Sequence, residues 1–301
     1  MPLSQYQYPN AQQPPGYPIR YHFVGNGSAP TGPVTIWPAQ VLETYWCTYN
    51  TTAQNWTDCC ADDAPTISGM LTLFEKLLAL PPSLTTAAQR AAWGAFATNR
   101  MPSLPLNPDG TIAPARVLSA GGSHNGEGPE LFAMHPHRVY TRGREVATGR
   151  SLATATATYN ASAWARYSNE GWNYAINAAV LAGLTDAAVA QLISRAGTPP
   201  APGDRFPGFS PQFQDYDPSA DHYANFARAL QEMLLQGGED GVENATLVLL
   251  PTWPCDWDVS ARLWGPGNTT VEFEYASGAL MSLVVTPASR EGAVKWAACV
   301  G

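Results

Sequence analysis

The chain has 301 residues, of which 45 % are hydrophobic, so it can bury a sizeable core in one large domain or in two ordinary ones. Only 13 % are charged, the formal net charge is −8, and all sixteen fixed positive charges come from two lysines and fourteen arginines. Nucleic acids and anionic membrane surfaces both require clustered Lys and Arg, so the composition argues against either partner. No apolar run reaches the ~20 residues of a membrane-spanning helix.

The first 36 residues are rich in Pro, Gly and Tyr, and we expect an irregular segment there. They lack the basic start and apolar stretch of a signal peptide and enter an apolar region abruptly, so we interpret the chain as the C-terminal piece of a longer protein. Six Asn-x-Ser/Thr sequons indicate a glycosylated protein of the secretory pathway or the extracellular space. The sequons are at Asn26, Asn50, Asn55, Asn160, Asn244 and Asn268.

The cysteines and histidines do not have the spacing of a metal site. The chain has five cysteines and neither a CxxC nor an HExxH motif. Cys47 can close a short loop with either Cys59 or Cys60. The pair His135 and His137 flanks a proline without a patterned carboxylate nearby, and we interpret both as polar residues at a helix end. We therefore predict no metal and no cofactor.

Helical periodicity begins at Pro65 and runs to Leu80, where two prolines end it. A second helix opens at Ser83 or Thr85 and stops before Pro102. A Gly pair is expected to end the last helix. The remaining predicted helices cover residues 144–159, 169–183, 185–196 and 220–236.

After residue 240 the hydrophobic period changes from 3.6 to 2, which predicts short antiparallel strands. These strands cover residues 246–250, 259–264, 270–275 and 281–285. We therefore predict three parts, an irregular segment (1–36), a helical domain (37–240) and a small β-sandwich-like domain (241–301). About six helices can form a bundle or half of a barrel of six helical hairpins, and the pattern alone does not choose between these.

The chain lacks the glycine-rich fingerprint of dinucleotide-binding folds, the GK[ST] phosphate loop and the GxSxG nucleophile elbow. The remaining candidates for a functional site are carboxylates that lie among aromatic residues. Sugar sites combine stacking rings with polar groups, because a sugar has apolar C–H faces and a rim of hydroxyls. Cleavage of a glycosidic bond then requires two carboxyl groups.

Two segments meet this description, residues 36–46 and 213–225. Glu43 lies among the rings of the first segment, where a carboxyl would be desolvated and suited to act as a general acid. Asp221 opens a helix in the second segment, where it can act as a base. Each also has a structural interpretation, Glu43 as an edge residue and Asp221 as a helix cap.

Asp215 and Asp217 compete with Asp221 for the role of the base. The residues that we expect to contact a sugar are mainly aromatic, and core packing is the alternative role of Trp172. These candidates are Trp46, Trp172, Tyr216, His222, Tyr223 and Asn225.

In order and spacing, these segments resemble the C-terminal half of glycoside hydrolase family 95, a branch of the six-hairpin glycosidases. Pro38 and Glu43 have the spacing of the family's Pro-x-x-x-x-Glu segment. Asp221 precedes Glu232-Met-Leu-Leu-Gln236 by eleven positions, as the family's aspartate does. Two further stretches are similar, residues 129–136 at a helix start and residues 249–259 at the entry to the β domain.

The resemblance implies a mostly α fold, the C-terminal half of an (α/α)6 barrel followed by a small antiparallel β domain. It implies hydrolysis of a glycosidic bond with inversion, as in α-L-fucosidases, with Glu43 as the general acid and Asp221 as the general base. The expected partner is an oligosaccharide or polysaccharide. The alternatives are a non-catalytic carbohydrate-binding protein and a truncated, inactive fragment of such an enzyme.

Overall fold

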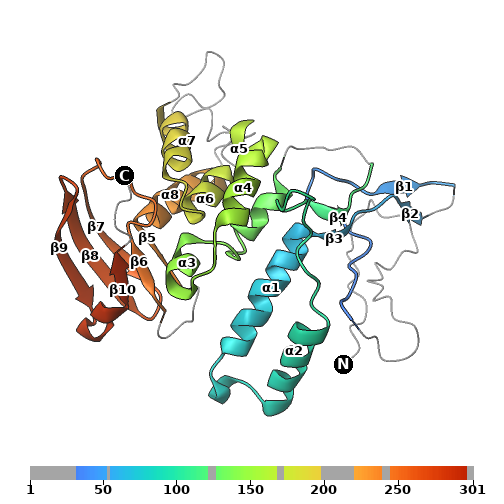
Figure 1. The fold of residues 1–301 in the computed structure, drawn as a ribbon, viewed down its shortest axis with the longest axis horizontal. Helices are drawn as coiled ribbons and strands as arrows, with labels where there is room; N and C mark the ends of the chain where they lie inside the picture. Colours follow the sequence, from blue (N-terminus) through green and yellow to red (C-terminus); the bar gives the residue numbers. More distant parts are fainter. Residues whose placement is uncertain are drawn as a thin grey trace.

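A computed structural model of the chain describes residues 32–52, 55–120, 127–167, 173–197, 220–238 and 245–296. Over these ranges the fold is a mixed arrangement of helices and small sheets (Figure 1). Helices occupy the middle of the molecule, a three-stranded sheet lies at one end, and two short strand pairs lie toward the other. The predicted succession of helices followed by antiparallel strands is present.

The strand pairs near the N-terminal end were not predicted. Each strand has only three residues, too few for a period of two to be visible in the sequence. The hairpin consists of β1 (Thr48–Asn50) and β2 (Asn55–Thr57), and the second pair consists of β3 (Ala61–Asp63) and β4 (Ala115–Val117). Because β3 leads directly into the first helix, this pair fixes where that helix begins.

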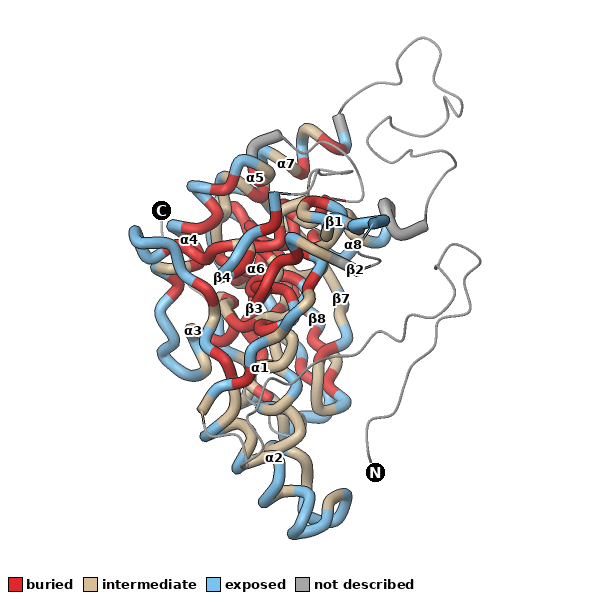
Figure 2. The backbone as a smooth tube through the Cα atoms, turned by 90° about the vertical axis from the view of Figure 1, so that its right-hand side faces the viewer, coloured by how far each residue is buried: buried red, intermediate tan, exposed pale blue. Residues whose placement is uncertain are grey.

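The first two helices, α1 (Ala64–Ala79) and α2 (Ala87–Asn99), project from the body as a hairpin (Figures 1 and 2). The Oδ1 atom of Asp63 accepts the Thr66 N–H at 2.7 Å and caps α1. A short 3-10 turn, η1 (Pro82–Leu84), joins the two helices. Both were predicted, and α2 has no buried residue, so this hairpin shares little of the core.

Two glycines of this hairpin have different surroundings. A Cβ atom at Gly69 of α1 would lie 3.1 Å from Cε1 of His137, so a larger residue at this position requires the ring to shift by a few tenths of an ångström. The Thr72 hydroxyl donates to the His137 carbonyl at 2.5 Å and strengthens the same contact. A Cβ atom at Gly94 of α2 would meet no atom within 4 Å.

The central helices surround α6, in which all seven residues are buried (Figure 2). The predicted helix over 144–159 is wrong in one respect, because it is broken at Gly149, which adopts a left-handed φ of 75°. The described helices after α2 are η2 (Pro129–Ala133), α3 (Arg142–Thr148), α4 (Ala153–Ala161), α5 (Ala163–Tyr167), α6 (Ala175–Leu181), α7 (Thr185–Gly197), α8 (Ala220–Leu234) and, near the C-terminus, the 3-10 helix η4 (Ala288–Ala293).

The expected last turn of α8 is a strand instead. Residues of β5 (Leu235–Gly237) pair antiparallel with β6 (Leu247–Leu249), and β10 (Val294–Trp296) pairs parallel with β6 on its other side. This sheet therefore connects the helical part directly to the C-terminal strands.

The C-terminal sheet is an antiparallel meander of β7 (Val259–Gly265), β8 (Thr269–Ala276) and β9 (Ala279–Thr286). Its central strand alternates as predicted, with Phe273 and Tyr275 buried between exposed glutamates. Buried side chains of β8 belong to the same apolar cluster as α6 and α8. The sheet and the helices therefore share one core. None of the described helices is both long enough and apolar enough to cross a membrane.

Gln236 of β5 is the polar centre of this junction. Its Oε1 accepts the Gly143 N–H at 3.0 Å, and its Nε2 donates to the Val180 carbonyl at 3.0 Å and to the Glu232 carbonyl at 3.2 Å. The side chain is buried, with 1 % of its residue surface exposed. It therefore satisfies backbone groups of three helices that water cannot reach.

Replacing Gln236 with leucine should lower the free energy of unfolding by about 2–4 kcal/mol, because the variant removes three buried hydrogen bonds and leaves the Gly143 N–H without its partner. Urea denaturation at pH 7 measures this change. The matched control is Gln231→Leu, at an exposed position of α8, for which we expect a change within about 0.5 kcal/mol. Equal losses in the two variants would contradict this role of Gln236.

Candidate functional site

Glu43 lies in a tight turn between Val41 and Tyr45. These two residues exchange backbone hydrogen bonds, each of 3.1 Å. Leu42 adopts a left-handed conformation with φ of 54°, which is uncommon for a leucine. Conformations of this kind cost about 1–3 kcal/mol and concentrate at functional sites. The turn is therefore a rigid support for the side chain that it carries.

A loop that is distant in the sequence fixes this turn. The Oε2 atom of Glu127 accepts the Glu43 N–H at 2.8 Å. The buried Thr44 donates its hydroxyl to the Glu127 carbonyl and accepts the Glu127 N–H, both at 3.0 Å. These hydrogen bonds place two carboxylate-bearing residues, Glu43 and Glu127, side by side.

The Glu43 side chain is exposed, so the expectation that its aromatic neighbours would desolvate it is wrong. The turn buries Val41 and Thr44 on either side of Glu43 and leaves the carboxyl accessible to solvent. The neighbouring Trp46 is also partly exposed, at 36 %. A ring and an acid that are close in the sequence therefore both reach solvent at this turn.

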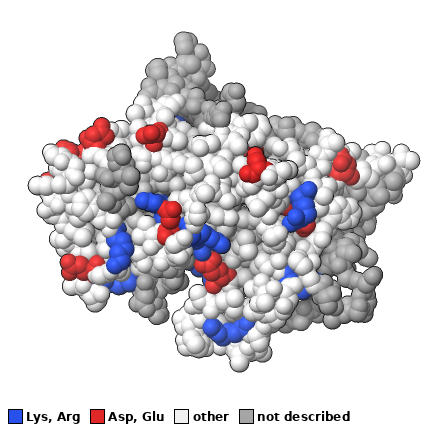
Figure 3. All heavy atoms as spheres, viewed as in Figure 1, with Lys and Arg blue, Asp and Glu red and all other residues white. Residues whose placement is uncertain are grey.

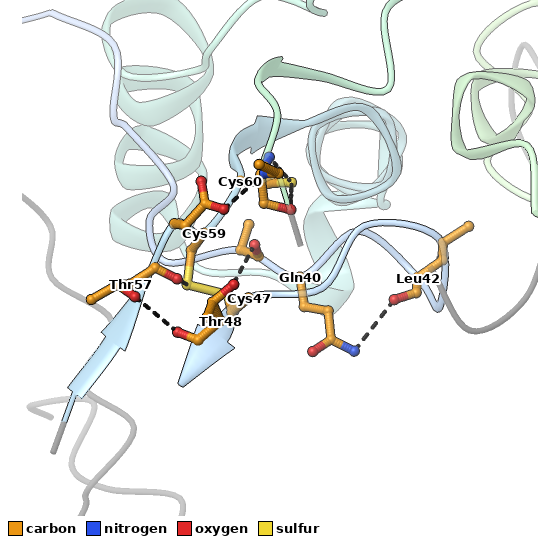
Figure 4. The surroundings of a disulfide bond; sticks show 11 residues. Gln40, Leu42, Cys47, Thr48, Thr57, Cys59 and Cys60 are labelled. Carbon is orange, nitrogen blue, oxygen red and sulfur yellow. Dashed lines mark hydrogen bonds between the residues drawn. A yellow bond between two sulfur atoms is a disulfide. The ribbon is translucent and has the colours of Figure 1, made fainter. Parts of the chain in front are cut away.

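A disulfide between Cys47 and Cys59 joins the two ends of the β1–β2 hairpin next to the turn (Figure 4). The sequence left Cys59 and Cys60 as alternative partners of Cys47, and Cys59 is the one bonded. Cys60 is buried and points away from the disulfide, where its Sγ lies 3.5 Å from the Ser119 hydroxyl. The cysteines thus brace the segment that leads into and out of the turn.

Glu130, in η2, is a buried carboxyl that the sequence reading did not assign to the site. Its Oε1 accepts the Ser162 hydroxyl at 2.5 Å. Burial raises the pKa of Glu130, and the Ser162 hydrogen bond lowers it to a smaller extent. The sequence gives only Pro129-Glu130, which is typical of a helix start. Ser162, whose hydrogen bond marks Glu130 as part of a buried polar pair, lies 32 positions away in the sequence.

A small recess lies beside Glu127, with a volume of about 10 Å³. It is lined by the start of η2 and the start of α6, including Leu131, Asn173 and Tyr174. This volume holds about one water molecule and not a sugar ring. A sugar would therefore have to lie outside the recess, at the level of the exposed Glu43.

The helix α6 connects this recess to α8. Asn177, one turn into α6, donates its Nδ2 to the Asn225 carbonyl at 3.0 Å. Asn225 is four residues after Asp221 and shares its helix face. Asp221 and His222 lie in the first turn of α8, but their side chains are outside the part that the structure describes. The base proposed from the sequence therefore precedes a helix segment that α6 holds in place.

The other sequence candidates are less informative. Tyr223 and Asn225 are half-buried on α8. Trp172 and Tyr216, and the competing Asp215 and Asp217, lie outside the described residues.

The two histidines are not simply polar residues at a helix end, as the sequence suggested. His135 is buried against the Tyr174 ring, with ring centres 5.2 Å apart. Burial, and then the positive charges of Arg228 and Arg138, lower the pKa of His135 to about 3. His135 is therefore a neutral imidazole at pH 7, packed against Tyr174, one of the residues that line the recess.

Within the described residues, no group of three His, Cys, Asp or Glu side chains could hold a metal ion. No model of a known protein family matches the chain, and no curated protein matches it significantly. Family membership therefore stays a prediction from the motifs.

We expect His135 to make the protein sensitive to acid. The unfolded chain takes up this proton near pH 6.5 and the folded chain near pH 3, so the unfolded state binds more protons between these values. Lowering the pH from 7 to 4 should then reduce the free energy of unfolding by on the order of 3 kcal/mol through this group.

Urea denaturation of the wild type and of His135→Gln across this range tests the expectation. The variant removes the titrating group and keeps a polar side chain of similar size. Its stability should fall less than that of the wild type as the pH decreases. Identical pH dependence in both proteins would show that His135 does not stay neutral in the fold.

Proposed function

We propose that the chain belongs to a glycoside hydrolase that cleaves a glycosidic bond with inversion, resembling family 95 and its α-L-fucosidases. Glu43 is the general acid and Asp221 is the general base. The substrate is an oligosaccharide or polysaccharide, and the helical part forms half of an (α/α)6 barrel followed by the small β region. The expected location is the secretory pathway or the extracellular space.

One observation above all supports this assignment. The Glu43 carboxyl is exposed on a turn that Glu127 and Thr44 hold rigid through three hydrogen bonds. A general acid has to reach the oxygen that it protonates, and its position has to be fixed for proton transfer to be efficient. The exposed Glu43 carboxyl meets the first requirement, and the hydrogen-bonded backbone of its turn supports the second.

In the proposed reaction, Glu43 gives its proton to the glycosidic oxygen as the bond from that oxygen to the anomeric carbon breaks. Asp221 takes a proton from a water molecule whose oxygen forms the new bond on the opposite face. The products are a free alcohol and a sugar of inverted configuration. The two carboxyl groups would lie about 6.5–9.5 Å apart to leave room for this water. The exposed Trp46 is suited to stack against a sugar ring.

The alternative is a non-catalytic carbohydrate-binding protein or an inactive fragment. The α1–α2 hairpin favours the inactive fragment. None of the residues of α2 is buried, and the exposed fractions of Leu73 and Leu84 are 54 % and 71 %. Helices of a complete barrel would bury such positions against neighbouring helices.

Hydrolysis of a panel of aryl glycosides, including an aryl α-L-fucoside, tests the proposal. We expect turnover by the wild type and a loss of at least about 100-fold in kcat for Glu43→Gln and for Asp221→Asn, because each removes one proton-transfer group. Glu272→Gln, at an exposed position of β8, is the matched control and should leave kcat unchanged. NMR of the first product should show the inverted anomer.

Turnover that survives both Glu43→Gln and Asp221→Asn would refute the roles given to these residues. Glu130→Gln tests a different acid, since it keeps an acceptor for Ser162 and removes the ionisable group. A loss of activity in Glu130→Gln with full activity in Glu43→Gln would transfer the role of acid to Glu130. Glycan binding without turnover, weakened by Trp46→Ala, would support the non-catalytic alternative.

A further inference from the structure

A groove of about 660 Å³ lies between α8 and the end of β7, away from the Glu43 turn. This is within the usual size range of ligand-binding pockets. One face of α8 forms its first wall, with Arg228, Gln231 and Glu232 among the residues that line it. The outward face of β7 contributes Arg262 and Trp264, which are two residues apart and so point the same way.

The charges in this groove differ from those of the whole protein. Three arginines and one acid line it, namely Arg138, Arg228, Arg262 and Glu232, which gives a net charge of +2 in a chain whose net charge is −8. The exposed Glu272 of the neighbouring strand lies 3.9 Å from Arg262 and offsets part of this charge. On the face shown in Figure 3, charged side chains are scattered singly or in small groups and most of the surface is uncharged. An excess of arginine in one groove therefore marks it as a site for an anion.

Two of the arginines are held in position by the acid. Arg138 donates to Oε1 of Glu232 at 2.6 Å, and Nε of Arg228 donates to the same oxygen at 3.2 Å. Glu232 is largely buried, whereas the Arg228 side chain is 47 % exposed. Because Arg228 is bound through Nε, its two terminal nitrogens are available to form a bidentate pair with a carboxylate.

Trp264 adds a flat apolar surface at the same groove, and 70 % of it is exposed. An indole ring of this kind stacks on the C–H face of a sugar. The second oxygen of Glu232, Oε2, has no hydrogen-bond partner among the described residues. Gln231 offers a further polar group at the rim.

We infer that this groove binds an acidic saccharide, a chain containing uronic acid residues whose carboxylate pairs with Arg228 and whose ring stacks on Trp264. The site is separate from Glu43 and Asp221 and does not depend on hydrolysis. A phosphate group has no apolar ring face to stack on Trp264. A uronate combines one negative charge for the arginines with a ring whose C–H face stacks on Trp264.

Isothermal titration calorimetry of the full chain with tri-galacturonate tests this inference. The neutral galactose trisaccharide and AMP are the comparison ligands. We expect tri-galacturonate to bind at least tenfold more tightly than either, and its affinity to fall as NaCl is raised from 50 to 300 mM. Arg228→Gln and Trp264→Ala should each weaken binding about tenfold, through loss of a charge-assisted hydrogen bond and of the stacking surface.

Two controls remove a charge or an apolar side chain outside the groove. Lys295→Gln on β10 and Met281→Ala on β9 both change exposed residues and should bind tri-galacturonate as the wild type does. If circular dichroism shows that Arg228→Gln is unfolded, Arg262→Gln replaces it, because that side chain is 73 % exposed.

The inference is overturned if tri-galacturonate gives no binding at 10 mM, if the neutral trisaccharide binds equally well, or if AMP binds more tightly. Wild-type affinity in both groove variants would also overturn it. Calorimetry measures binding and does not depend on hydrolysis. A protein without hydrolase activity can therefore still bind the uronide, and an active hydrolase can fail to bind it. The outcome here is therefore distinct from the outcome for the proposed hydrolase.

Discussion

The helix α6 has to satisfy its polar groups without water, because all seven of its residues are buried. The Val180 carbonyl, in its last turn, accepts hydrogen bonds from Gln236 at 3.0 Å and from Thr252 at 2.7 Å. A helix end leaves such carbonyls without intrahelical partners. Besides the Gly183 N–H at 3.2 Å, the partners here come from β5 and from the loop after β6, so the last turn of this buried helix is hydrogen-bonded to the sheet region.

The same constraint positions both candidate sites. Asn177 of α6 holds α8 through the Asn225 carbonyl, and the start of α6 lines the recess beside Glu127. One end of α8 carries Asp221, and its remaining turns form a wall of the arginine groove. In Figure 1 the central helices separate the β1–β2 hairpin from the β7–β9 sheet. The two proposed sugar sites therefore use different parts of one helical body.

Periodicity predicted the parts of the fold that each have one long amphipathic face. The first helix, α7 and the strands β7 to β9 were predicted because their apolar positions recur within a single segment, although the buried residues of α1 are all at its start. The end of α8 was wrong because Leu235 and Gln236 pair with β6, a contact made across the chain. The break at Gly149 was also missed, since a single glycine inside an apolar pattern is compatible with a continuous helix.

The site was harder to predict than the fold, for a similar reason. Aromatic neighbours in the sequence suggested that Glu43 is desolvated, but a turn at Leu42 directs it to solvent. Glu130 has no aromatic neighbours in the sequence except Phe132, yet it is the buried acid, because Ser162 and the surrounding helices cover it. Burial of a carboxyl depends on packing between distant segments, which local composition does not specify.

The two glycines of the α1–α2 hairpin differ in how readily each can be replaced by a larger residue. At Gly69 the absence of a side chain leaves room for the His137 ring, which lies where a Cβ atom would make a close contact. At Gly94 the space is empty, and the glycine only adds freedom to the unfolded chain. Evolution can therefore fill the second position and gain rigidity, whereas the first admits a larger residue only if the His137 ring or α1 shifts to make room.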